Sequence, residues 1–286
     1  MDTGAAAVPA KAGITLSLAG QREMPMRPIC LHDKTTIESL LRKNTELHIY
    51  AIGDLDDFFW PYTTWYALPA DNEFEAMVLL YTGQELPTLV ALSEQPGVTA
   101  KLLESILHLL PVRFYAHLSQ GLEDVFHRTH SLDSHGEHYK MALHHRGYVD
   151  DLRCGDVLRL DGSDLDELYR LYQDSYPGNW FEPRMLETNQ YFGIRRQGQL
   201  VSAAGVHVYS ESYRVAALGN IATHPAYRRR GYGKLVTARL CQSLLEKVDH
   251  IGLNVKVDNE AAVCCYQKLG FEIVASYGEF MIQLRS

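Results

Sequence analysis

The sequence predicts an α/β protein of two similar halves, each a central mixed sheet flanked by helices. Strand-like and helix-like segments alternate along the 286 residues. A strand–helix–strand step over residues 214–257 implies a parallel pair of strands inside a sheet. A strand and the helix after it also recur 139 residues apart, at Val112 and Leu122 and again at Ile251 and Ala261. Two unrelated α/β domains remain the alternative.

The second half has the clearer pattern, with elements in the order β, α, α, β, β, β, α, β, α, β. Ser163 is expected to cap its first helix, with Asp166 as the second residue of the capping pair. Gln197-Gly198 is expected to form a hairpin turn, and Gly270 to end the last helix. The expected strands and helices, identified from their apolar spacing, cover residues 157–160, 163–172, 181–188, 191–196, 200–209, 214–222, 231–248, 251–257, 259–269 and 271–284.

The first half repeats this order more faintly. We place the boundary near Gly147 to Asp150, so that residues 27–149 form one domain and residues 150–286 the other. Residues 1–26 are expected to be a flexible extension. The expected elements of the first half are a helix at 37–41, strands at 63–68, 74–81 and 87–92, a helix at 98–110, a strand at 112–118, a helix at 122–129 and a strand at 138–143.

Composition favours a cytoplasmic globular protein that binds neither nucleic acid nor membranes. Apolar residues make up 46% of the chain, and 27 basic against 35 acidic residues give a net charge of −8. No apolar stretch approaches the ~20 residues of a membrane helix. The five cysteines show no CxxC spacing, so we expect reduced thiols. The histidine pairs 135/138 and 144/145 lack an obvious third ligand, so no metal is expected.

The one dense basic cluster is Arg228-Arg229-Arg230-Gly231-Tyr232-Gly233-Lys234, at the start of the long helix. Its glycines let a ligand approach the backbone, and the first turn of a helix offers unpaired N–H groups with a partial positive charge. This combination suits a pyrophosphate. A P-loop is excluded because Leu235 follows Lys234, and a dinucleotide fingerprint lacks its third glycine. A solvated basic turn is the alternative.

These residues resemble sequence motifs of the GNAT superfamily of N-acetyltransferases. Arg228-x-x-Gly231-x-Gly233 is similar to the family motif Q/R-x-x-G-x-G/A, and the preceding Asn220-Ile-Ala-Thr-His-Pro is similar to the strand and turn found there. Residues 259–271 resemble the second signature, N-x-x-A-x-x-x-Y-x-x-x-G-F. The similarity covers roughly residues 218–271, and the element order extends it over the second half. The tandem arrangement looks like the glycine N-acyltransferase-like branch.

The resemblance implies an acyl-CoA-dependent N-acetyltransferase that moves an acetyl or small acyl group to a primary amine by direct attack. Acetyl-CoA or another acyl-CoA is then the co-substrate. Tyr266 is expected to protonate the departing thiolate, while strand N–H groups stabilise the oxyanion; a packed aromatic is the alternative. The cofactor-binding residues that the resemblance implies are Ile221, Thr223, Arg228, Arg229, Arg230, Gly231, Tyr232, Gly233, Lys234, Asn254 and Asn259.

The general base is not identified by the sequence. Family members often carry a Glu on the strand before the loop, but Val215–Asn220 contains no carboxylate. His207 is the leading candidate because its ordinary pKa lies near neutrality. Glu211, His224 and a water held by Asn220 are further candidates. The acceptor is expected to be a small-molecule or peptide amine. A non-catalytic acyl-CoA sensor is the alternative function.

The first half lacks the basic motif. Its equivalent turn, Ser93–Val98, contains Glu94, which would repel a pyrophosphate, and Pro96, which has no backbone donor. We therefore expect a degenerate half without a CoA site, and one CoA per chain. A homodimer is compatible with the sequence.

Overall fold

The strands of the protein form one continuous mixed sheet. The structure is a computed structural model that describes Met1, residues 27–70 and residues 73–285. Apart from Met1, the expected extension at residues 1–26 lies outside the described residues. In the described part the sheet has 12 strands, in the order β1-β2-β3-β4-β5-β12-β6-β11-β10-β9-β8-β7. The predicted architecture of mixed sheet and flanking helices is confirmed.

The second half follows the predicted order, with two local corrections. Its elements are β7 (Leu158–Arg159), η5 (Gly162–Asp164), α5 (Leu165–Ser175), η6 (Pro183–Thr188), β8 (Phe192–Arg196), β9 (Gln199–Ser210), β10 (Val215–Thr223), η7 (Pro225–Tyr227), α6 (Tyr232–Leu245), β11 (His250–Lys256), α7 (Glu260–Gln267) and β12 (Phe271–Leu284). The cap before α5 is Asp161 with Asp164, not Ser163 with Asp166, because the Asp161 carboxylate accepts from the Ser163 N–H. The expected helix at 181–188 is a 3₁₀ helix.

The first half contains elements that its sequence did not suggest, namely β1, α2, α4 and the short 3₁₀ helices η1 and η2. Its elements are β1 (Ile29–Leu31), α1 (Lys34–Leu41), η1 (Arg42–Asn44), α2 (Ile49–Gly53), η2 (Trp60–Tyr62), β2 (Thr63–Ala70), β3 (Glu73–Tyr81), β4 (Thr88–Ala91), α3 (Pro96–Ile106), η3 (Leu107–Leu109), β5 (Arg113–Leu118), η4 (Leu122–Val125), β6 (His130–Leu143) and α4 (Gly147–Asp150). The helix expected at 122–129 is the short 3₁₀ helix η4.

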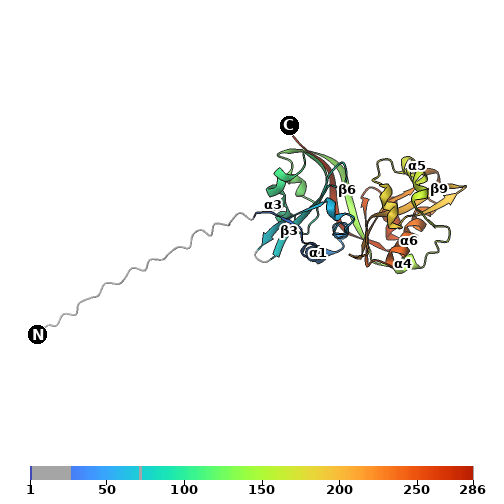
Figure 1. The fold of residues 1–286 in the computed structure, drawn as a ribbon, viewed down its shortest axis with the longest axis horizontal. Coiled ribbons are helices and arrows are strands. Elements are labelled where there is room, and N and C mark those ends of the chain that lie inside the picture. The colour runs from blue at the N-terminus through green and yellow to red at the C-terminus, as the bar shows by residue number, and fades with distance from the viewer. Residues whose placement is uncertain (2–26, 71–72, 286) are drawn as a thin grey trace.

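The last strand of the chain, β12, crosses into the first half. It pairs antiparallel with β5 on one side and with β6 on the other, and β6 in turn pairs with β11. Figure 1 shows β12 (red) running beside β6 (green) in the part of the molecule that carries α3 and β3. The boundary between residues 149 and 150 stays a prediction, and backbone pairing crosses it.

The parallel pair expected in the second half is β10 with β11. Val215 to Leu218 pair with His250 to Leu253, and beyond these positions the two strands have no further pairs with each other. β10 continues along β9 through two register shifts, with Asn220 at a φ of 54°. β11 continues along β6. The parallel strands therefore part after Leu218 and Leu253.

Helix α2 of the first half packs on the sheet of the second half. Ile49, Ile52 and Leu55 share a core with Val208, Val215 and Ala217 of β9 and β10. The alternate residues Val206, Ala216 and Leu218 join another core, which contains α6. Successive residues of β10 face opposite sides, and the bulge at His207 puts Val206 and Val208 of β9 on opposite faces too, so α2 and α6 cover opposite faces of these strands. A Cβ on Gly53 would lie 2.0 Å from Val208 Cγ1, so this approach requires glycine.

Candidate active site

The site begins at the unpaired edge of β10. Gly219, Ala222 and Thr223 pair only with β9, so the opposite edge faces the gap that β11 has left. Ile221 and Thr223 lie on this stretch and are half-buried. An edge of this kind offers backbone N–H and C=O groups to an extended ligand, as an added strand would use them.

The start of α6 has the geometry of an anion site. Gly231 is its N-cap, with a φ of 81°, and no side chain caps the helix. Arg229 also has a positive φ, 61°. The first-turn N–H groups, those of Tyr232, Gly233 and Lys234, therefore lack a capping acceptor and carry the positive end of the helix dipole. Thr223 on the unpaired edge is close, since a Cβ on Gly233 would lie 3.3 Å from Thr223 Oγ1.

Two of the three arginines in the loop brace it. Arg228 donates from Nε to the Thr223 carbonyl and from Nη2 to the Ser175 carbonyl, each at 3.1 Å. Arg230 donates to the Ala226 carbonyl at 3.3 Å and lies over the Tyr227 ring. Arg229 and Lys234 have no hydrogen bond or ion pair to any described side chain. Their charged groups are therefore available to bind an anion.

The two asparagines expected to bind the cofactor already make hydrogen bonds inside the protein. Asn259 is the N-cap of α7, and its Oδ1 accepts from the Ala262 N–H at 3.3 Å. Asn254 Oδ1 accepts from Lys140 Nζ at 3.3 Å, so this side chain faces a residue of β6. The structure thus brings Ile221, Thr223 and residues 228–234 together at one edge, while the asparagine side chains bond elsewhere.

Tyr266 lies buried on α7, with its ring 6.1 Å from that of Phe271. Among the described residues its hydroxyl has no hydrogen-bond partner. Burial raises the pKa of Tyr266 well above its ordinary value of 10.0, so the phenol stays protonated at neutral pH. A protonated and unpaired hydroxyl is what a proton donor to a thiolate requires.

His207 is the bulged residue of β9 and lies against β10. A Cβ on Gly219 would be 2.2 Å from its Cδ2, and the Trp180 ring is 5.3 Å away. Burial lowers the pKa of His207 to about 4, which keeps the imidazole neutral at pH 7 and makes it a weak base. Its Nε2 is buried without a hydrogen-bond partner.

The other candidates for the base have structural contacts. His224 Nδ1 accepts from the Ala226 N–H at 3.2 Å and so shapes the turn before the loop. Glu211 accepts from Tyr209 and lies 3.6 Å from Lys247, at the end of α6 opposite the loop. Asn220 donates to Tyr191 and accepts from Asn179, which holds the bulge of β10. Of these candidates, Glu211 is too remote from the loop to act there, because it lies beside Lys247 at the far end of α6.

The sequence did not predict the buried polar cluster around Glu279 of β12. Its Oε2 accepts from the Tyr115 hydroxyl at 2.5 Å and its Oε1 from the Tyr277 hydroxyl at 2.7 Å. His117 and His138 bring Nε2 to 3.5 and 3.6 Å from the same carboxylate. Burial opposes ionisation of Glu279, but these neighbours outweigh it and lower its pKa. The feature of the sequence that could have indicated this cluster is an acidic residue within an otherwise apolar strand.

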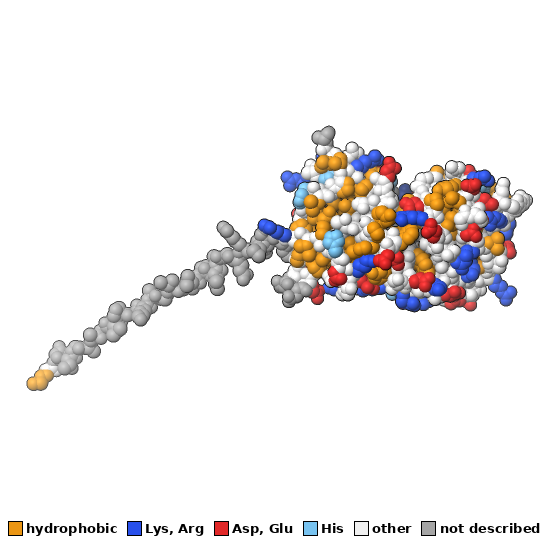
Figure 2. Space-filling view, in the orientation of Figure 1, with side chains coloured by type: hydrophobic (Ala, Val, Ile, Leu, Met, Phe, Trp, Pro, Cys, Tyr) orange, Lys and Arg blue, Asp and Glu red, His pale blue; other side chains and the backbone are white. Residues whose placement is uncertain are grey.

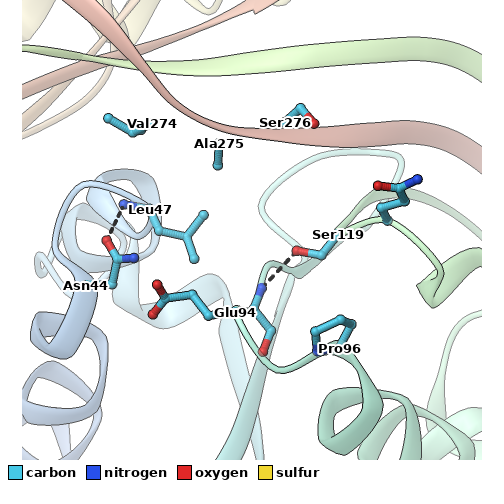
Figure 3. Close-up of a pocket in the computed structure, with 10 residues that line it drawn as sticks. Asn44, Leu47, Glu94, Pro96, Ser119, Val274, Ala275 and Ser276 are labelled. Carbon is cyan, nitrogen blue, oxygen red and sulfur yellow. Dashed lines mark hydrogen bonds between the residues drawn. The ribbon is translucent and has the colours of Figure 1, made fainter.

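The equivalent turn of the first half is closed. Ser119 Oγ accepts from the Ser93 N–H at 2.9 Å, and the Ser119 N–H donates to the Ala91 carbonyl at 3.0 Å, so β4 and β5 stay joined where a gap would be needed. Figure 3 shows Glu94 and Pro96 at the adjacent pocket of about 340 Å³. Its lining residues are Asn44, Leu47, Ser93, Glu94, Pro96, Ser119, Gln120, Val274, Ala275 and Ser276.

Known proteins are similar to this chain in sequence and in fold. Residues 165–271 match the acetyltransferase (GNAT) family. The N-alpha-acetyltransferase RimI of Mycobacterium tuberculosis is 35% identical over 136 residues, which cover 44% of this chain and 82% of that protein. The chain belongs to the GNAT acetyltransferase family. It is an acyl-CoA-dependent N-acetyltransferase.

Further relatives extend this likeness. The [ribosomal protein bS18]-alanine N-acetyltransferase of Escherichia coli is 30% identical over 121 residues, covering 40% of this chain and 79% of its own. Among solved structures, a Drosophila protein has a TM-score of 0.68 at 14% identity and covers 90% of this chain and 98% of its own. A tandem GNAT protein from the clavulanic acid biosynthesis pathway has a TM-score of 0.56 at 14% identity, covering 89% and 97%. At these identities the structures show a shared fold.

Three further observations concern membranes, metals and surface charge. None of the described helices is long and apolar enough to cross a membrane. Within residues 27–70 and 73–285, no three His, Cys, Asp or Glu side chains gather as metal ligands would. On the face seen in Figure 2, basic and acidic side chains are interspersed.

Proposed function

We propose that the protein transfers an acetyl or other small acyl group from acyl-CoA to a primary amine, by direct attack, at one site in the second half. The observation that carries this proposal is the junction of the unpaired edge of β10 with the uncapped start of α6. These two features supply, side by side, donors for an extended amide-containing arm and donors for a pyrophosphate.

Binding of the acyl-CoA divides between backbone and side chains. The backbone of Ile221 and Thr223 pairs with the pantetheine arm, and the N–H groups of Tyr232 to Lys234 hold the pyrophosphate. Arg229 and Lys234 add charge, whereas Arg228 and Arg230 hold the loop in shape. Asn254 and Asn259 make a smaller contribution, because their side-chain oxygens already accept hydrogen bonds inside the protein.

The chemistry needs a donor at the leaving sulfur and donors at the oxyanion. The neutral amine attacks the thioester carbonyl carbon, and backbone N–H groups at the bulge of β10 stabilise the oxyanion. When the C–S bond breaks, the Tyr266 hydroxyl gives its proton to the thiolate. Its raised pKa supports this role, since the phenol remains protonated until the thiolate forms. His207 stays the leading candidate for the base on position alone.

The names of the relatives support an amine acceptor in general. Two of them are named for acetylating an alanine of a ribosomal protein and an N-terminal amine. A peptide α-amine and a small primary amine are therefore the two acceptor types to compare first. Both present an ammonium ion at neutral pH, which must lose a proton before it attacks.

The test is release of free thiol from acetyl-CoA and propionyl-CoA in the presence of single amines. Ethylamine and a short peptide with an N-terminal alanine represent the two types. We expect thiol release that depends on one of the amines and is lost in Gly233→Val. Tight acetyl-CoA binding without thiol release from any primary amine would instead indicate the non-catalytic acyl-CoA sensor.

A further inference from the structure

We infer that Glu279 binds the ammonium group of the acyl acceptor, in a site that β5, β6 and β12 assemble from both halves of the chain. The inference rests on the proposed function, because it names the acceptor subsite of the same reaction. It adds Glu279 to the proposed site. This residue lies far from the two sequence motifs, on the last strand of the second half, which pairs with two strands of the first half.

The strand register places the polar groups on one face. Glu279 is paired with His117, and Tyr277 with His138. Residues two apart in a strand face the same way. The cluster continues along β6 to Lys140, whose Nζ donates to Asn254 on β11, the first residue beyond the pairing with β10. A polar row therefore leads from Glu279 to the gap between β10 and β11.

Glu279 has no permanent cation beside it. Within 4.0 Å of its carboxylate, the only basic groups among the described residues are the imidazoles of His117 and His138. The side chain is 14% exposed, and the two imidazoles with the hydroxyls of Tyr115 and Tyr277 are the groups that favour its charged form. A carboxylate buried this far is costly without a positive partner. An ammonium ion that can reach the exposed part supplies the missing charge.

The hydrogen bonds of His138 point to the same ligand. Its Nδ1 lies 3.3 Å from the Gly136 carbonyl oxygen, which can only accept, so Nδ1 carries a hydrogen. Whenever the ring is neutral, Nε2 is then an acceptor and faces the Glu279 Oε2 at 3.6 Å. In that state two acceptors face each other, and a donor between them stabilises both. An ammonium group has three donors and can bond to both.

Of the other described groups around Glu279, Lys140 carries part of a positive charge at pH 7 and the rest carry almost none. Burial lowers the pKa of His117 and that of His207 to about 4, so both are neutral at pH 7. Burial lowers the pKa of Lys140 to about 7, against the pull of Glu279. The hydroxyls within electrostatic reach stay protonated because burial raises the pKa of Tyr50, Tyr115, Tyr176 and Tyr277.

The kinetic test compares Glu279→Gln with Glu137→Gln. Glu137 lies on β6 opposite Gly278, is exposed, and has the same charge to lose. With the amine that gives most thiol release, Glu279→Gln should raise the KM of the amine about 30-fold or more, as expected for a lost charged hydrogen bond, and leave the KM of acetyl-CoA unchanged. Glu137→Gln should change neither. An unaltered amine KM in Glu279→Gln would overturn the inference, provided acetyl-CoA binding shows that the variant is folded.

A second measurement does not depend on turnover. Protein labelled with ¹⁵N at histidine is titrated with ethylammonium chloride, and with sodium chloride and ethanol as controls. We expect a saturable shift of the His138 Nε2 resonance with ethylammonium alone, absent from Glu279→Gln. No shift, or the same shift in the variant, would contradict the site. A shift in a protein that releases no thiol would refute the proposed catalysis and leave the cation site standing.

Discussion

The hydroxyl of Tyr50 donates a hydrogen bond of 3.3 Å to the carbonyl of Leu218. Leu218 is the last residue of β10 that pairs with β11, and Tyr50 belongs to α2 of the first half. The first half thus bonds to the second at the point where the parallel strands part. Tyr50 also lies under Lys140, whose Nζ is 4.8 Å from its ring centre. This contact places a residue of the first half beside the gap between β10 and β11.

Tyr50→Phe should lower the free energy of unfolding by about 1 kcal/mol, the usual contribution of a partly buried hydrogen bond. The ring and its packing remain, so the change isolates the hydroxyl. Urea unfolding followed by tryptophan fluorescence measures the difference. Tyr148→Phe is the matched control, because Tyr148 is 57% exposed. Equal losses in the two variants would show that the Leu218 bond contributes nothing.

Tyr266→Phe should lower kcat by about 10²-fold or more, since proton donation in a transition state is usually worth 10²–10⁴-fold. The affinity for acetyl-CoA should stay nearly the same, because the hydroxyl meets the sulfur only as it leaves. Steady-state kinetics with calorimetric titration separate the two quantities. Tyr169→Phe on the surface of α5 should have wild-type kcat. Wild-type turnover in Tyr266→Phe would remove this residue from the mechanism.

Lys140 should make stability depend on pH. Burial lowers its pKa from 10.5 to about 7, so between these values the unfolded chain holds one more proton here than the folded chain. Stability then rises with pH across this window, and below pH 7 the penalty for the buried charge is fully present. Lys140→Met should therefore stabilise the protein at pH 6 by at least about 1 kcal/mol, with the gain shrinking toward pH 10.

Urea unfolding of both proteins at pH 6 and pH 10 measures this change. Lys101→Met, at an exposed position of α3, is the control and should show no such trend. A Lys140→Met protein that is less stable than the wild type at pH 6 would mean that Glu279 compensates the lysine in full.

The parts of the site that the sequence predicts are local in the chain. The conformation of the loop from Arg228 to Lys234 depends on a helix start, two glycines and short-range hydrogen bonds to Thr223 and Ala226. The parallel pair β10–β11 follows from one strand–helix–strand step. The cap before α5 shows the limit even here. Asp161 and Ser163 are both good capping residues two positions apart, and propensity alone does not choose between them.

The parts that the sequence did not predict depend on distant pairing. The apolar alternation of β12 fits any open edge of a sheet, so it does not specify that the strand lies between β5 and β6. Glu279 gains its neighbours only through that placement. Helix α2 is too short for a helical period to identify it, and its position against Val208 depends on Gly53. Tertiary contact, not local pattern, decides these elements.

Calorimetric titration of acetyl-CoA into the full chain tests the central claim, that one acyl-CoA binds at the start of α6, most directly. We expect one site per chain, lost in Gly233→Val because a side chain there would intrude toward Thr223, where the backbone must meet the pyrophosphate. Gly97→Val makes the same change in the equivalent turn of the first half, where a Cβ meets nothing within 4 Å, and should retain the site. Two sites per chain, or unchanged affinity in a folded Gly233→Val protein, would contradict the account.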